Sequence, residues 1–235
     1  MNHGEKKPIA QWAFITPTIG SLVFLIFTTI AMFFYKGGTA FNPDLNRYDF
    51  FHNFFSDLGR TYVYDGESNS ISSTLFISAA VISGILLIPY YINLSKIPFG
   101  TEKKQKYARF ATRISLISSP AFVAVGLIPS NINTDMHMLA VNIAFMGTGI
   151  IIIIYGILFL NHENYPRISG KLFLLYSVLL LIYIFVMIIF LDPNQGNAFL
   201  IQVLSQKIIV YTNIIVMSTQ GILGYQWSSK IISDN

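Results

Sequence analysis

Six apolar runs, each long enough to cross a lipid bilayer, are the feature of this chain that most restricts its fold. An α-helix needs about 20 predominantly apolar residues to cross the hydrocarbon core. The runs cover residues 12–35, 71–92, 110–128, 138–160, 172–191 and 199–225. They are too long and too uniformly apolar to be barrel strands, and in lipid only helices and closed barrels satisfy all backbone hydrogen bonds. We therefore predict an all-α integral membrane protein, a bundle of six transmembrane helices.

The composition agrees with a membrane protein of one domain. Only 11% of the 235 residues are charged, whereas a soluble domain carries about 25%. No polar segment between the runs is long enough to fold separately, so we expect a single transmembrane domain over residues 1–235. The chain has no cysteine, which excludes disulfides and thiolate metal sites. The first run lacks a small-residue cleavage site, so we expect it to be retained as a helix.

The distribution of basic residues predicts the orientation in the membrane. With six spans, both termini and the loops 93–109 and 161–171 face the same side. That side, with its helix ends, carries 11 of the 15 Lys and Arg residues. The positive-inside rule then predicts a multi-pass protein of the cell membrane with both termini in the cytoplasm. No soluble basic face is present, so we expect membrane lipids as partners and no nucleic acid, and the oligomeric state stays open.

The first exofacial loop contains the sequence DFFHNFFSDLGR at residues 49–60. At helical spacing its apolar residues share one face, and its polar residues share the opposite face. The polar set is His52, Asn53, Ser56, Asp57 and Arg60. We predict an interfacial helix over about 48–58, with Phe51, Phe54 and Phe55 in apolar surroundings. Such a helix could carry a site, or it could only anchor the loop.

A second polar cluster lies at the start of the fourth apolar run. Asn133 or Thr134 is suited to cap a helix, and Asp135 suits the positive end of the helix dipole. His137 and Asn142 are not explained by capping, and polar side chains at membrane depth are expected to face the bundle. We predict that His137 shares one exofacial pocket with the Asp57 carboxylate.

Two kinds of catalysis are compatible with these clusters. His52 and Ser56 would be neighbours on a helix, and a Ser–His pair beside an Asp can activate a nucleophile. The candidate catalytic residues are therefore His52, Ser56, Asp57 and His137. His52, Asp57 and His137 are also weak candidates for a divalent metal, but no HExxH spacing supports that site. We predict no cofactor, and the metal remains the lesser alternative.

The sixth run carries polar doublets at intervals of seven residues. Seven residues are close to two helical turns, so the doublets line one face through most of the bilayer. They are Ser205–Gln206, Thr212–Asn213 and Thr219–Gln220. This face would form either the wall of a polar pathway or interhelical hydrogen bonds.

Two short motifs carry a resemblance to a known family. Ser56–Asp57–Leu58–Gly59 precedes the second run, and Val125–Gly126–Leu127–Ile128–Pro129 precedes His137. This layout resembles the prokaryotic membrane family called domain of unknown function 998, which is itself similar to multispan proteins of the Frag/DRAM type. The resemblance implies six spans and no established activity. It also implies that the characteristic positions are Asn53, Ser56, Asp57, Gly59, Pro129 and His137.

A looser resemblance connects the chain with ceramidase-like intramembrane hydrolases. These enzymes use three His, a Ser and an Asp around zinc. This chain departs from that pattern, because only two of its four His residues are expected on the exofacial side. The departure weakens the case for zinc-dependent hydrolysis.

The sequence thus predicts an exofacial polar pocket that binds or handles a lipid or small amphiphile. Beside the catalytic candidates, the expected binding residues are Asn53, Arg60, Asp135, Asn142, Gln206 and Asn213. The alternatives are a lipid hydrolase, dependent on a metal or on a Ser–His pair, and a small-solute transporter lined by the sixth span. The sequence does not decide among them.

Overall fold

The fold is a bundle of six long helices in a computed structural model that describes residues 9–189 and 197–233. Within these residues, six helices are long and apolar enough to cross a membrane, which confirms the predicted fold class. They are α1 (Gln11–Phe34), α2 (Ser70–Leu94), α3 (Glu102–Leu127), α4 (Thr134–Leu160), α5 (Arg167–Ile189) and α6 (Ala198–Ser233). A short 3-10 helix, η1 (Phe55–Gly59), lies in the first loop. The last two residues of the predicted span 172–191 lie outside the described residues.

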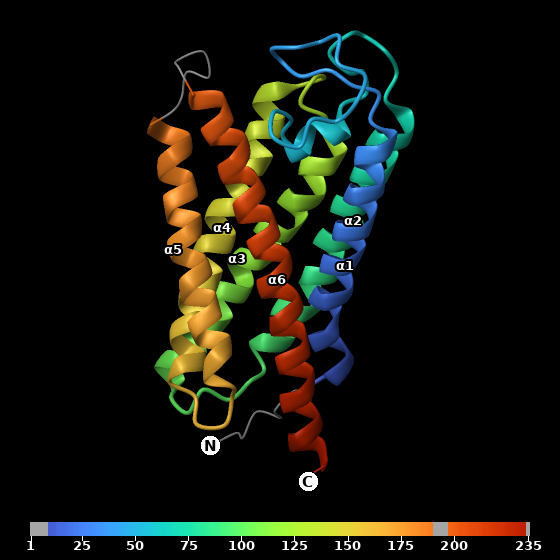
Figure 1. Cartoon of the computed structure of the whole chain (residues 1–235). Coiled ribbons are helices and arrows are strands. Elements are labelled where there is room, and N and C mark those ends of the chain that lie inside the picture. Colours follow the sequence, from blue (N-terminus) through green and yellow to red (C-terminus); the bar gives the residue numbers. More distant parts are fainter. Residues whose placement is uncertain (1–8, 190–196, 234–235) are drawn as a thin grey trace.

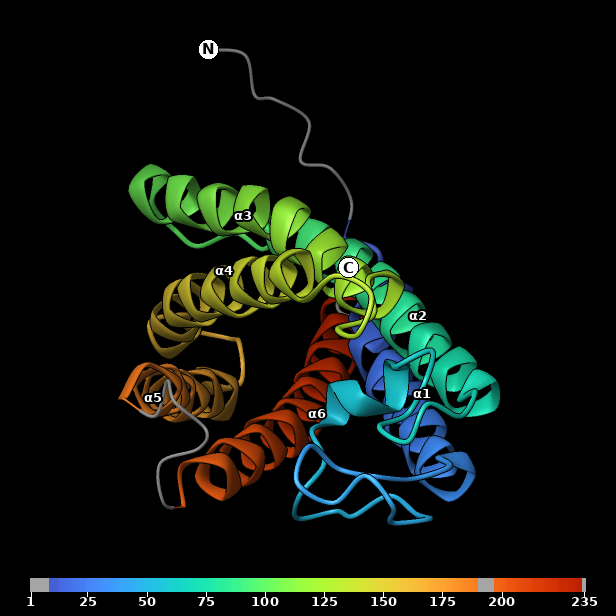
Figure 2. The same cartoon turned by 90° about the horizontal axis from the view of Figure 1, so that it is seen from above.

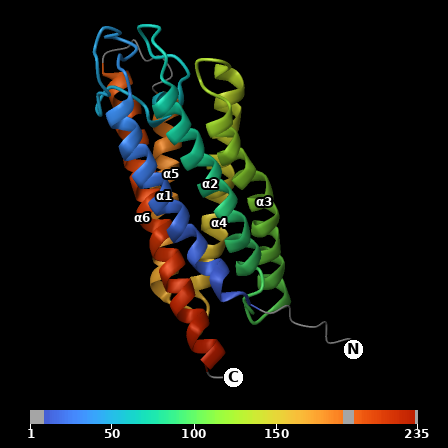
Figure 3. The same ribbon diagram turned by 90° about the vertical axis from the view of Figure 1, so that its right-hand side faces the viewer.

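The helices form a closed ring in which each contacts its neighbours in sequence. The last helix, α6, also packs against α1, which closes the ring. Figure 1 shows the loop between α1 and α2 over the upper end of the bundle, and Figure 2 shows η1 lying above α1 and α6. Figure 3 shows α1 beside α6 and α2 beside α3. We call the end with η1 and the α3–α4 turn the upper end.

Close packing of α1 on α2 depends on small residues and on side-chain bonds to the backbone. A Cβ atom on Gly20 would meet the Ser83 Cα at 3.3 Å, so a larger residue would push the helices apart. The Ser83 hydroxyl donates to the Gly20 carbonyl at 2.8 Å. At the lower end, the Asn93 amide bonds both backbone groups of Ala10, at 2.9 and 3.0 Å.

The lower half of the bundle is filled by aromatic side chains. Phe159 stacks on Tyr165 with ring centroids 4.1 Å apart and lies 5.9 Å from Phe173. The Tyr155 hydroxyl lies 2.8 Å from that of Thr112 and donates to a backbone carbonyl. Buried aromatic rings in such contacts pack tightly and hold the helices together. The open space of the bundle is therefore found in its upper half.

The predicted helix over residues 48–58 is wrong as a continuous element. Residues 50–52 form a turn, and only Phe55–Gly59 is helical, as one short 3-10 segment. Local side-chain bonds explain the difference, because Asn53 accepts from the Asp49 amide and Asp57 accepts from the Phe54 amide, both at 2.9 Å. Such bonds compete with helical hydrogen bonding. As a result Phe55 is buried, whereas Phe51 is 57% exposed.

Candidate functional site

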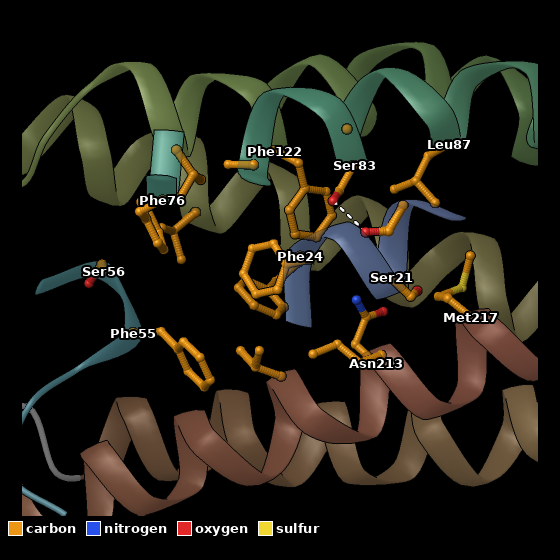
Figure 4. A pocket seen from close by; sticks show the side chains of 18 of the residues that line it. Ser21, Phe24, Phe55, Ser56, Phe76, Ser83, Leu87, Phe122, Asn213 and Met217 are labelled. Carbon is orange, nitrogen blue, oxygen red and sulfur yellow. Dashed lines mark hydrogen bonds between the residues drawn. The ribbon is translucent and has the colours of Figure 1, made fainter. Parts of the chain in front are cut away.

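A cavity of about 120 Å³ lies inside the upper half of the bundle. Its walls come from α1, α2, α3, α4, α6 and η1, so every helix except α5 contributes. Figure 4 shows Phe24 and Asn213 reaching into this space from α1 and α6. Most lining residues are aliphatic or aromatic. The polar ones are Ser21, Ser56, Ser83, His137, Gln206 and Asn213.

The upper wall of the cavity is η1, which is held by α1 and α6. The Phe55 amide donates to the Gln206 side-chain oxygen at 2.7 Å. The Phe55 ring packs on Phe24 and Tyr211, with centroids 6.2 and 5.4 Å away. The contact between Phe55 and Gln206 therefore attaches the loop to α6. Ser56, the next residue, lines the cavity.

A buried carboxylate organises the loop behind η1. Asp57 is 3% exposed and accepts from the Asn53 amide, the Phe54 backbone amide and the Tyr64 hydroxyl, at 3.1, 2.9 and 3.2 Å. Burial raises the pKa of Asp57, although these bonds and the nearby Arg60 act in the opposite direction. Asp57 is not among the residues that line the cavity. Its carboxylate holds the loop together.

Lys207 attaches the same loop to α6 by a different contact. Its ammonium group donates to the Tyr48 hydroxyl. It also lies 4.7, 5.0 and 4.3 Å from the ring centroids of Tyr48, Phe50 and Phe55. A cation within about 6 Å of aromatic faces is attracted by them. The buried ammonium thus lies among loop aromatics, and Lys207 does not line the cavity.

His137 brings a defined acceptor to the cavity wall. The residue is 3% exposed, and its Nδ1 lies 2.7 Å from the Ile128 carbonyl oxygen. A carbonyl can only accept, so Nδ1 carries the proton of this bond. In the neutral ring Nε2 is then an acceptor. Nε2 is the ring nitrogen that remains for a ligand.

The comparisons with known proteins identify the family. A family model described as "Protein of unknown function (DUF998)" matches residues 18–217. The chain belongs to the DUF998 family. The match includes η1 and all the cavity-lining residues except Pro17. Searches of curated proteins and of solved structures gave no match.

The DUF998 family resemblance drawn from the sequence is therefore confirmed. The positions that it implied lie at the upper end of the bundle. Asn53 and Asp57 are buried in the loop, and Ser56 and His137 line the cavity. Gly59 packs against α2, where an added Cβ would lie 2.5 Å from the Phe76 ring. The relation to Frag/DRAM-type proteins stays a prediction.

The structure brings together only part of the predicted site. Ser56, His137, Gln206 and Asn213 line one cavity. His52 instead lies at an exposed turn, where its Nδ1 is 2.9 Å from the Asp49 carboxylate. The predicted pairing of His52 with Ser56 depended on the helix that does not form.

Three other predicted residues lie away from the cavity walls. The Arg60 guanidinium lies 4.0 Å from the Tyr64 ring centroid. Asp135 is exposed in the first turn of α4, as its capping position predicts. Asn142 is exposed on the outer face of α4, so the prediction that it faces the bundle is wrong. Asn142 follows His137 by five positions, a rotation of about 140° at 3.6 residues per turn, which turns it outward.

Sequence reasoning missed the α1 and α2 side of the cavity. Ser21 and Ser83 lie next to the close contact between Gly20 and α2. The small residues in the first two spans were the sequence feature that could have indicated this side of the cavity. Across residues 9–189 and 197–233, no group of three or more His, Asp or Glu side chains is arranged to hold a metal ion.

Proposed function

We propose that this protein binds a lipid or small amphiphile inside its helical bundle. One observation carries the proposal: a cavity with mainly apolar walls has polar side chains from three separate elements near its upper end, Ser56, His137 and Gln206. Ligand sites are typically apolar concavities with a few convergent polar groups. An amphiphile matches both parts, because its chain would contact the walls and its head would bond the polar groups.

The orientation of the bundle determines from which side of the membrane the ligand would enter. The two connections at the lower end, α2–α3 and α4–α5, lie in the basic loops of the sequence, as do the starts of α1 and α3. We propose that the lower end faces the cytoplasm and that the protein resides in the cell membrane. The ligand would then be taken from the outer leaflet.

The experiment is a cavity-filling substitution with a matched control. Asn213→Phe replaces an amide that points into the cavity by a larger ring (Figure 4). Ile215→Phe makes a similar change two residues away, at a side chain that is 65% exposed. The proteins are purified in lipid nanodiscs, and the co-purified lipids and amphiphiles are quantified by mass spectrometry.

We expect one class of amphiphile to be retained by the original protein and by Ile215→Phe, and to be lost from Asn213→Phe. The same amphiphile content in all three proteins would contradict the proposal. A thermal unfolding curve of each variant checks that Asn213→Phe is folded.

Lipid hydrolysis is a second candidate, favoured by one observation. Ser56 and His137 line the same cavity, and the acceptor nitrogen of His137 could serve as a general base for the Ser56 hydroxyl. Release of fatty acid from ester lipids by the purified protein, abolished in Ser56→Ala, would support hydrolysis. Absence of release while the amphiphile stays bound would leave binding as the function.

A further inference from the structure

We infer that the cavity selects a small, uncharged amphiphile with a hydroxyl head, such as a short-chain alcohol. This inference rests on the proposed function and adds the chemical class of the ligand. It follows from the charges, the hydrogen-bonding groups and the size of the cavity. Each of these is a property of described residues.

The cavity wall contains no formal charge to pair with a charged head group. None of its lining residues is Lys, Arg, Asp or Glu. The two nearest charges in sequence have other partners. Lys207, beside Gln206, lies among the loop aromatics, and Asp57, beside Ser56, is bonded within the loop. An ionised head group buried here would lose its hydration without gaining a counterion, which is strongly unfavourable.

The polar groups that remain available suit a ligand that can both donate and accept. His137 offers Nε2 as an acceptor. The oxygen of the Gln206 amide is used by the Phe55 amide, which leaves its NH₂ group to donate. Asn213 reaches the cavity with both a donor and an acceptor (Figure 4). A carboxylate or phosphate dianion can only accept, whereas a hydroxyl group can use both kinds of partner.

The size of the cavity favours a ligand with a short chain. Its volume of about 120 Å³ is smaller than the roughly 150 Å³ of an engineered protein cavity that holds one benzene molecule. A single long acyl chain already exceeds this space, as does a lipid with two chains, whereas the chain of a short-chain alcohol fits. The lining on α6 runs from Gln206 to Met217, about 16 Å at 1.5 Å per residue. With Leu87 and Pro17, Met217 gives the deeper end an apolar wall suited to a chain terminus.

The test compares two photoreactive probes that differ only in the head group. A diazirine-bearing short-chain alcohol and the carboxylic acid of the same chain are added separately to the full chain in nanodiscs at pH 8. After irradiation, labelled peptides are mapped by mass spectrometry. At pH 8 we expect the alcohol to label the cavity-lining peptides at least about ten-fold more than the acid.

Two variants test the assigned contacts. His137→Phe removes the acceptor but keeps a ring of similar size, and it should reduce labelling by the alcohol. Ile215→Phe, on the exposed face of α6, should leave labelling unchanged. Equal labelling by the acid and the alcohol at pH 8 would overturn the inference and leave the proposed function intact. Absence of cavity labelling by both probes would overturn both.

Discussion

Replacement of Asp57 should open the first loop, because this carboxylate satisfies three donors in a buried position. Asp57→Ala would leave the Asn53 amide, the Phe54 backbone amide and the Tyr64 hydroxyl without their acceptor. A net loss of about 1 kcal/mol for each hydrogen bond gives about 3 kcal/mol against the closed loop. At 1.4 kcal/mol for each factor of ten, the open population should rise about 100-fold.

A single thiol can report this opening, because the chain has no cysteine of its own. Val63 lies in the loop and is 3% exposed, so Val63→Cys introduces a thiol that reacts only when the loop opens. The rate of modification by a water-soluble thiol reagent is measured with and without Asp57→Ala. Asp57→Asn is the matched control, since it keeps an acceptor oxygen and the side-chain shape. We expect about 100-fold faster modification with Asp57→Ala and a much smaller change with Asp57→Asn.

The same thiol tests the effect of pH on the loop. Burial raises the pKa of Asp57, so the closed loop holds the proton more tightly than the open loop. Proton binding by Asp57 therefore stabilises the closed loop. This stabilisation is complete at a pH below the ordinary aspartate pKa and is lost as the pH rises through the raised pKa of Asp57 in the closed loop. Relative to Asp57→Asn, modification of the loop with Asp57 should therefore accelerate as the pH rises from about 4. A constant ratio across this range, or no acceleration with Asp57→Ala, would refute the reasoning.

Two further tests concern contacts of the upper end, and a third concerns the orientation in the membrane. Gln206→Leu removes the acceptor for the η1 amide, so thiol modification in the loop should rise about ten-fold, while Ile208→Leu, at a side chain that is 61% exposed, should stay near the original rate. Gly59→Ala puts a methyl group 2.5 Å from a ring of α2 and should cost about 1–3 kcal/mol of unfolding free energy, whereas Gly149→Ala in α4 meets its nearest neighbour at an ordinary 3.5 Å and should cost less, by thermal denaturation. For orientation, Asn42→Cys in intact cells should react with an impermeant thiol reagent and Lys103→Cys should not; the reverse result would overturn the cytoplasmic placement of the termini.

Some features of the site followed directly from residue types and spacing. His137 lies at the start of a helix, as predicted. The helical period of 3.6 residues per turn could also have predicted that Asn142 turns outward. Gln206 and Asn213 are seven residues apart on α6, and both line the cavity. These positions were predictable because they depend only on the rotation of residues about one helix axis. The identity of the residues that oppose them across the bundle could not be read in this way.

The loop shows where reasoning from periodicity fails. The apolar and polar spacing of residues 49–60 matches an amphipathic helix, yet Asn53 and Asp57 bond the local backbone and stop that helix from forming. The positions of both side chains also depend on distant segments. Asn53 donates to the Gly38 carbonyl, and the Phe55 amide finds its acceptor 151 residues away on α6.

The sequence by itself determined the six spans and the family, because the length and apolarity needed to cross a bilayer are properties of each segment alone. Only the tertiary structure decided that Ser56 and His137 share a cavity while Asp57 lies outside its lining. The reason is physical. A buried polar group takes whichever partner the packed helices and loop bring within hydrogen-bonding distance, and that choice is made among residues far apart in the chain.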